Sequence, residues 1–256
     1  MEKPNVLPAA VELIGRVDWL IKLRWVAVAG VVCTVELARR IIPVRLALGQ
    51  IYVVLAGIAL YNIILQLAAK RLQRTPAGRF LRRGLSFVHV LTPRALWGIE
   101  PEGEALQAVV FANMQISLDL VALAVILHFA GGIENPFIYF LIFHAIIAGM
   151  LLSRRATYFQ GALGLALISA VAMGECFGLL EHYPLNAAWQ ADAYRDPTLV
   201  MAQLTTLAIT LCIAIYMTSN IAVHLRNRER QIYLLANEVS NESHQFQRIR
   251  RICKER

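Results

Sequence analysis

The segment Gly131–Phe137, with the sequence Gly-Gly-Ile-Glu-Asn-Pro-Phe, combines residue types that could bind a flat redox carrier. A helix that begins after Asn135 would present backbone N–H donors and the positive end of its dipole. A quinone head group is flat and apolar and has two carbonyl acceptors, so donors beside aromatic rings suit it, and glycines would let the ring approach the backbone. The residues of this candidate quinone site are Gly131, Gly132, Asn135, Pro136, Phe137, Tyr139 and His144.

The same segment also has a complete structural interpretation. The glycines can adopt the left-handed conformation that ends a helix. Asn135 can cap the next helix, and Pro136 fits a first helical turn, where no amide donor is needed. The residues alone leave both interpretations open.

Further ionisable residues lie in or near apolar segments. Asp119 stands in the middle of one, where a carboxylate is costly unless it is protonated, paired or in a wet cavity. It is therefore a candidate proton relay coupled to quinone reduction, and a buried polar contact is the equal alternative. Glu36 and Arg40 are expected to pair on one helix face. Glu175 is expected to reach toward the outer interface, and His182 to be exposed in an outer loop.

Histidines 128 and 144 raise a rival hypothesis, a haem held between two neighbouring helices. At about 1.5 Å of rise per residue, the two side chains would differ by about 7 to 8 Å in depth. Ligands of one haem should lie nearly level, so His144 is better interpreted as a core residue or as part of the quinone site.

The elements that carry these residues belong to a membrane protein. The 256-residue chain is 58% hydrophobic and only 16% charged, whereas soluble domains carry about 25% charged residues. This composition argues against a disordered chain, a disulfide scaffold and a nucleic-acid-binding module. The four cysteines are scattered without a C-x-x-C pair, so we expect no zinc site or iron–sulfur cluster and no metal.

Apolar runs of about 20 residues are long enough to cross a bilayer. They predict an all-α membrane protein with six transmembrane helices, at 22–41, 47–69, 106–130, 136–153, 156–177 and 198–223. We expect an amphipathic lead-in at 1–21, a six-helix transmembrane domain at 22–223 and a cytoplasmic helix at 224–256. In the fifth span, a ridge of small residues is expected to pack closely on a neighbouring helix: Ala162, Ala166, Ala170 and Gly174.

Lysine and arginine are distributed unevenly between the connecting segments. If both termini are cytoplasmic, the inner segments hold 21 of the 25 basic residues. The positive-inside bias then places both ends in the cytoplasm and predicts a multi-pass protein of the bacterial inner (cytoplasmic) membrane. Residues 78–97 are expected to lie on the cytoplasmic membrane surface.

The region after the sixth predicted span has a heptad pattern. Apolar side chains recur every seven residues at Leu225, Ile232, Val239, Phe246 and Cys253. This pattern favours a dimeric coiled coil over a solvated basic tail. In such a coil Cys253 would meet its twin, which makes it a candidate redox thiol.

Several of these features resemble the membrane domain of RegB-type (PrrB/ActS-like) redox-sensing histidine kinases. Gly131–Phe137 matches their G-G-x-x-N-P-F signature between spans three and four. Other matching segments are Leu23-Arg24-Trp25, Phe143-His144, residues 152–158 and residues 181–185. The resemblance implies a quinone, ubiquinone or menaquinone, as the ligand. It carries the quinone-binding role over to Gly131, Gly132, Asn135, Pro136 and Phe137.

The chain departs from that family beyond the membrane domain. His244 lacks the acidic neighbour and the proline of a phosphoacceptor site, and no segment resembles a Gly-rich ATP-binding domain. We therefore expect a sensor module of a two-component system that forms a homodimer and contacts membrane lipid, with the kinase or response regulator encoded separately and no nucleic acid bound. The alternative is a quinone- or haem-binding anchor subunit of a respiratory complex.

Overall fold

The computed structural model of the protein describes residues 7–41, 46–74, 104–185 and 193–254, and these residues form helices and short connections without a strand. The elements in chain order are α1 (Leu7–Ile41), α2 (Leu48–Arg74), α4 (Glu104–Phe129), the 3-10 helices η2 (Gly132–Glu134) and η3 (Pro136–Tyr139), α5 (Phe140–Leu151), α6 (Arg154–Cys176), the 3-10 helix η4 (Ala193–Arg195) and α7 (Pro197–Lys254).

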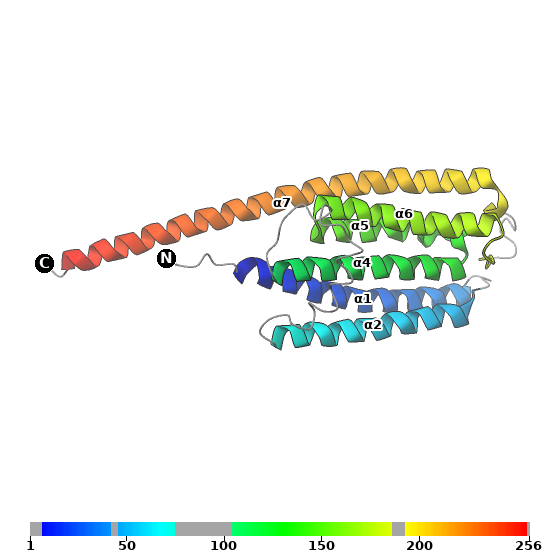
Figure 1. The fold of residues 1–256 in the computed structure, drawn as a ribbon, viewed down its shortest axis with the longest axis horizontal. Helices are drawn as coiled ribbons and strands as arrows, with labels where there is room; N and C mark the ends of the chain where they lie inside the picture. The colour runs from blue at the N-terminus through cyan, green and yellow to red at the C-terminus, as the bar shows by residue number, and fades with distance from the viewer. Residues whose placement is uncertain (1–6, 42–45, 75–103, 186–192, 255–256) are drawn as a thin grey trace.

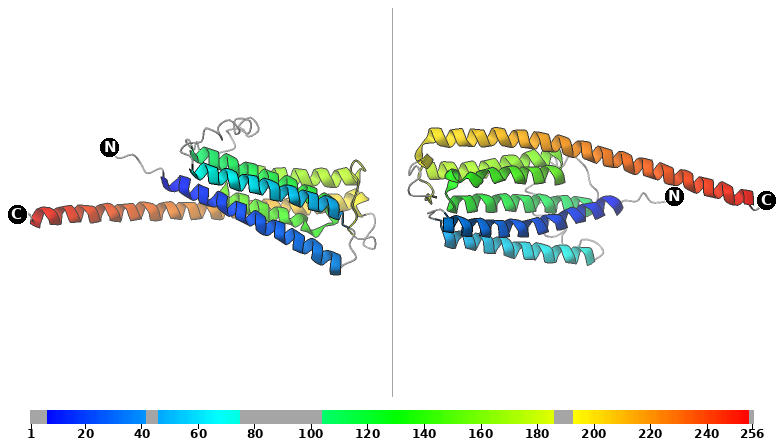
Figure 2. Two further views of the ribbon diagram at one scale, coloured as in Figure 1. Left: turned by 90° about the horizontal axis from the view of Figure 1, so that it is seen from below. Right: turned by 180° about the vertical axis from the view of Figure 1, so that it is seen from behind.

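Successive α-helices run in opposite directions along one elongated bundle (Figure 1). The three short 3-10 helices lie at one end of this bundle, which we call the turn end. α7 starts there, passes along the bundle and continues well beyond its other end, as both views in Figure 2 show. The first described residues of α1 and the last of α7 therefore lie toward the same end of the molecule.

α4 is the central helix because it contributes to two hydrophobic cores. One core joins it to α1 and α2 and contains Val35, Ile51 and Leu55. The larger core joins it mainly to α5, α6 and α7 and includes Leu141 and Leu207. The bundle thus consists of an α1–α2 pair on one side of α4 and an α5–α6–α7 group on the other.

The small residues that allow close packing in α6 differ from the expected ones. Of the four predicted ridge residues Gly174 is buried, but Ala162, Ala166 and Ala170 are exposed, so the ridge as a whole is wrong. Gly161 and Gly164 are buried instead, and a Cβ at these positions would collide with Ile215 of α7 and Leu141 of α5. The buried face of α6 follows the helical repeat of about 3.6 residues, whereas a strict spacing of four drifts away from it.

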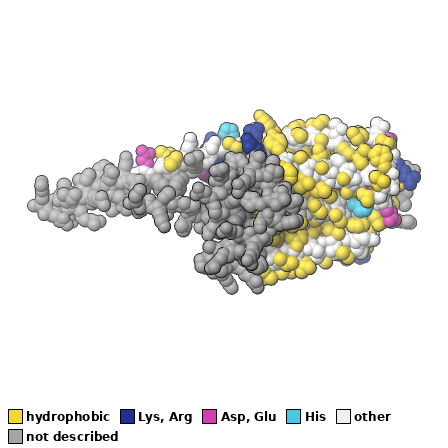
Figure 3. Space-filling view, in the orientation of Figure 1, with side chains coloured by type: hydrophobic (Ala, Val, Ile, Leu, Met, Phe, Trp, Pro, Cys, Tyr) yellow, Lys and Arg dark blue, Asp and Glu magenta, His cyan; other side chains and the backbone are white. Residues whose placement is uncertain are grey.

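Among the described residues, four helical segments are long and apolar enough to cross a membrane: Leu48–Leu67, Val110–Phe129, Arg154–Cys176 and Pro197–Ala236. Pro136–Leu151 is apolar but shorter. Hydrophobic side chains cover the visible flank of the bundle (Figure 3), as expected for a surface that faces lipid. An all-helical protein with helices that could span a membrane is thereby confirmed, whereas the six-span count and the orientation stay predictions.

The predicted helix boundaries agree with the described ones within a few residues for four of the spans. The expected boundaries at 21/22 and 223/224 fall inside the continuous helices α1 and α7, so neither interrupts the backbone. The predicted surface segment 78–97 lies outside the described residues.

Candidate functional site

The turn between α4 and α5 has the backbone that its sequence predicts. Gly131 and Gly132 have φ values of 106° and 52°, in the left-handed region that favours glycine. Asn135 Oδ1 accepts a hydrogen bond of 2.9 Å from the Phe137 N–H, and its Nδ2 donates one of 2.7 Å to the Ala130 carbonyl. Asn135 therefore caps η3 and also fastens the turn to the end of α4.

The open side of both glycines is occupied by protein. A Cβ on Gly131 would lie 2.9 Å from Leu185 Cβ, and a Cβ on Gly132 would collide with the Glu175 carboxylate. A quinone ring therefore cannot approach these glycines from the side on which a Cβ would stand, and their quinone-binding role stays a prediction. The sequence could not show this, because the covering residues come from α6 and from the loop that follows it.

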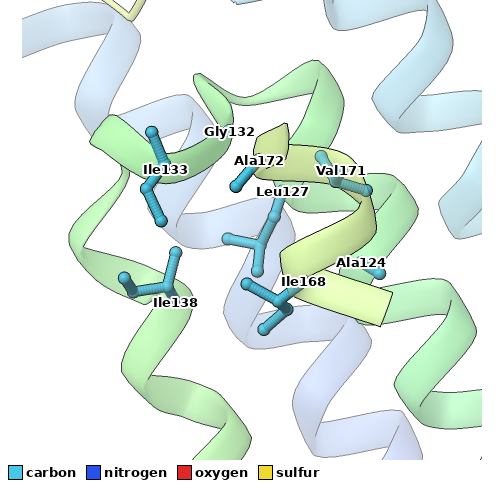
Figure 4. Close-up of a pocket in the computed structure, with 8 residues that line it drawn as sticks. All are labelled: Ala124, Leu127, Gly132, Ile133, Ile138, Ile168, Val171 and Ala172. Carbon is cyan, nitrogen blue, oxygen red and sulfur yellow. The ribbon is translucent and has the colours of Figure 1, made fainter. Parts of the chain in front are cut away.

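A small apolar cavity lies beneath the turn. Figure 4 shows Ile133 and Ile138 from the turn facing Leu127, Ile168 and Ala172 from α4 and α6. Its volume of about 10 Å³ is close to the minimum for one water molecule. A quinone head group does not fit inside it.

The aromatic residues of the turn form an exposed surface instead of an internal wall. The rings of Phe137 and Phe140 meet edge to face with centroids 4.9 Å apart, and Phe140 and Phe143 do so at 5.7 Å. Together with Tyr139 they are exposed on η3 and the start of α5. We call Phe137, Tyr139, Phe140 and Phe143 the aromatic face. His144 adjoins it, with Nδ1 3.0 Å from the Phe140 carbonyl oxygen.

A buried carboxylate between two imidazoles lies on the inner side of the same turn. The Glu175 side chain is 0% exposed and lies 2.7 Å from His128 Nδ1 and 2.7 Å from His182 Nδ1. His182 Nε2 lies 3.6 Å from Glu134 Oε2, and the ring of Tyr194 stacks on His182 with centroids 3.7 Å apart. We call His128, Glu134, Glu175 and His182 the carboxylate–imidazole chain.

Two expectations about members of the carboxylate–imidazole chain are wrong. His182, expected to be exposed, has a side chain that is only 4% exposed, and Glu175 does not extend outward but is buried. The cause is the backbone after α6: Gly178 adopts φ 72°, and the N–H groups of Leu179 and Leu180 both donate to the Gly174 carbonyl. This tight turn folds the loop back over the ends of α4 and α6.

Glu134 is the member of the carboxylate–imidazole chain that lies in the turn itself. Burial raises the pKa of Glu134 above the ordinary value, and the nearby His182 and the backbone N–H of Tyr194 offset this rise only in part. The carboxyl of Glu134 thus holds a proton more firmly than an exposed glutamate does.

The four side chains of the carboxylate–imidazole chain contact one another pairwise in a row, and they do not point at one common centre. Within the described part of the chain, no group of three or more His, Cys, Asp or Glu side chains is placed to hold a metal ion. His128 is engaged with Glu175, and His144 belongs to the opposite, aromatic side of the turn.

Asp119 is part of a second polar centre, deep in the bundle. Arg24 of α1 donates to both of its carboxylate oxygens at 2.7 Å, and Tyr61 of α2 also hydrogen-bonds to it. Arg24 further donates to Asn62 and Gln115 at 2.8 and 3.3 Å. The geometry is that of the buried contact, one of the two alternatives for Asp119.

Glu36 also has a different partner from the expected one. Its carboxylate accepts hydrogen bonds from Arg39 at 3.1 Å and from the Tyr52 hydroxyl at 2.7 Å, and no bond to Arg40 is formed within the described residues. The interaction fastens the turn-end termini of α1 and α2 to each other.

Comparison with protein-family models, curated proteins and solved structures finds no match for this chain. The fold and the site therefore define a class only: an all-helical protein with helices that could span a membrane, whose turn end combines an exposed aromatic face with a buried carboxylate–imidazole chain.

Proposed function

We propose that the chain is the membrane sensor module of a redox-responsive two-component system, and that a membrane quinone binds against its aromatic face. The proposal rests on the resemblance of Gly131–Phe137 to the signature of RegB-type kinases. Because the space beside the turn glycines is filled, the quinone ring is expected on the outer surface, in contact with Phe137 and Phe140, with the Tyr139 hydroxyl as a donor to one carbonyl.

The structural observation that carries the signalling part of the proposal is the continuous connection from the turn to α7. Tyr194 of η4 stacks on His182 beside the turn, and η4 packs against η2. Two residues later α7 begins, where the Asp196 side chain caps it by accepting from the Thr198 N–H at 2.8 Å. α7 is then one unbroken helix over Pro197–Lys254, so a displacement at the turn can pass along a single rigid element.

The far part of α7 is proposed to pair with a second copy of the chain. Leu225, Ile232 and Val239, three positions of the predicted heptad, are exposed in the single chain, and so is Leu235. A row of large apolar side chains on a solvated helix is stabilised when a partner covers it. The dimer would present its coil to a kinase or response regulator.

The proposed membrane arrangement follows the basic residues. Six spans with both ends in the cytoplasm agree with the alternating helix directions of Figure 1 and with the charge distribution. In this arrangement the turn end faces the outer side of a bacterial inner membrane, where the head group of a quinone is accessible.

A photoreactive quinone analogue tests the binding site in the protein reconstituted in lipid nanodiscs. We expect labelling to map to residues 137–143 and to fall about tenfold in Phe140→Ala, equivalent to about 1.4 kcal/mol of binding free energy. Phe177→Ala is the matched control, since it removes another exposed phenylalanine at the turn end. Equal labelling of both variants, or labelling spread over all lipid-facing helices, would contradict the proposal.

A further inference from the structure

The buried side of the turn end contains one imidazole nitrogen without a hydrogen-bond partner. His182 Nε2 is fully buried, and no group of the described residues hydrogen-bonds to it. The other ring nitrogen, Nδ1, is 2.7 Å from Glu175. A buried polar atom without a partner is costly, so its surroundings indicate what it interacts with.

The nearest acidic atom is Glu134 Oε2, at 3.6 Å. Two lone pairs, one on Nε2 and one on the carboxylate, would repel each other if no proton lay on either group. One proton removes the repulsion, whether it makes His182 an imidazolium or Glu134 a neutral carboxyl group. At 3.6 Å the two atoms form an ion-pair contact, longer than a hydrogen bond.

The same count of protons applies to the other two contacts of the carboxylate–imidazole chain. Glu175 meets His128 Nδ1 and His182 Nδ1, and each of these 2.7 Å contacts also requires one proton. Glu175 and His182 in the middle of the carboxylate–imidazole chain are buried, with side chains 0% and 4% exposed. Its two ends are accessible, since 15% of the Glu134 side chain and 16% of the His128 side chain are exposed.

From this arrangement we infer that His182 and Glu134 share one titratable proton, so that the turn end is a proton-binding site. The groups that face the pair are Glu175 from α6, which holds the opposite side of the His182 ring, and Tyr194 from η4, which stacks on it and directs its backbone N–H to Glu134. His128 from α4 acts on the pair through Glu175, and Tyr183 contacts the edge of His128.

Loss of the proton has a structural consequence. The lone pair of Nε2 would then face an ionised carboxylate inside the protein, and repulsion would separate η2 from the loop that holds His182. η4 packs against both η2 and α6 and leads directly into α7. The shared proton thus stabilises the packing of η2 against the loop that holds His182, whether or not a quinone is bound.

The test is a pH titration of the protein in quinone-free nanodiscs with isotope-labelled histidine, followed by nuclear magnetic resonance. The chain has six histidines, and the ring signals of each are followed separately. In Glu134→Gln we expect the titration midpoint of one histidine to fall by about one pH unit or more, because the carboxylate that stabilises the imidazolium is gone. His182→Asn should remove that same signal.

Glu181→Gln is the matched control. It makes the same change in charge in the adjacent loop, at an exposed carboxylate that contacts only Tyr183 among the described hydrogen bonds. Six midpoints that are unchanged in Glu134→Gln, or a midpoint that Glu181→Gln moves equally, would overturn the inference. Because no quinone is present, either result is independent of the quinone-binding experiment.

Discussion

At the scale of single residues, Asn135 shows how a residue of the predicted ligand site serves the fold. Its amide oxygen caps η3 and its amide nitrogen holds the Ala130 carbonyl, so both polar groups are used within the turn. The side chain is buried and has no polar group directed to a ligand. The residues that remain suited to a quinone are the exposed aromatic ones.

Replacing Asn135 by alanine removes a helix cap and leaves a buried carbonyl without its donor. We expect a loss of about 1 to 3 kcal/mol in the free energy of unfolding. Titration with a denaturing detergent in mixed micelles measures it. Asn227→Ala, at an exposed position of α7, is the control and should change stability by less than about 0.5 kcal/mol. Equal stability of the two variants would show that Asn135 has no structural role.

At the scale of helices, the centre around Arg24 joins three elements that are distant in sequence. Arg24 and Asp119 are separated by 95 residues, and Asn62 and Tyr61 bring α2 to the same point. In a low-dielectric interior an unpaired charge is far more costly than in water. This ion pair therefore links the α1–α2 pair to α4 at one defined point.

Arg24→Gln leaves the Asp119 carboxylate buried without its cation. We expect a loss of about 3 to 5 kcal/mol, and a double variant with Asp119→Asn should lose less than the two single losses added together. Arg39→Gln is the control, because its ion pair with Glu36 is exposed and should contribute about 0 to 1 kcal/mol. Additive losses in the double variant would mean that the two side chains do not stabilise each other.

At the scale of the whole molecule, α7 is the helix that connects the turn end of the bundle with the region beyond its other end. It packs on α5 and α6 within the bundle, and the Arg226 guanidinium donates to the Leu152 carbonyl at 3.1 Å where the helix leaves it. Beyond this point the described side chains of α7 are exposed. A single chain thus leaves the predicted heptad positions uncovered, which is the reason for proposing a dimer.

The heptad register makes a direct prediction about Cys253. In the proposed parallel coil the two copies of this residue face each other, so mild oxidation of the membrane-embedded protein should produce a crosslinked dimer. Non-reducing electrophoresis measures the product, and Cys253→Ser should abolish it. Cys33, Cys176 and Cys212 remain in that variant as internal controls. A stable dimer that forms no crosslink through Cys253 would contradict this register.

The local features of the protein were determined by its sequence. Helix boundaries, the left-handed glycines and the capping role of Asn135 depend on residues within one or two helical turns, and apolar runs with a 3.6-residue repeat indicate helices directly. The length and apolar character of these helices also predicted that some could cross a membrane.

Only the tertiary structure decided which side chains meet. Glu175 and His128 are 47 residues apart, and the sequence could not show that the loop after α6 turns back at Gly178 to bury His182 beside them. It could not show either that Leu185 and Glu175 fill the space above Gly131 and Gly132. Periodicity describes one helix at a time, whereas these contacts depend on the packing of α4 against α6 and on the path of the loop between α6 and α7.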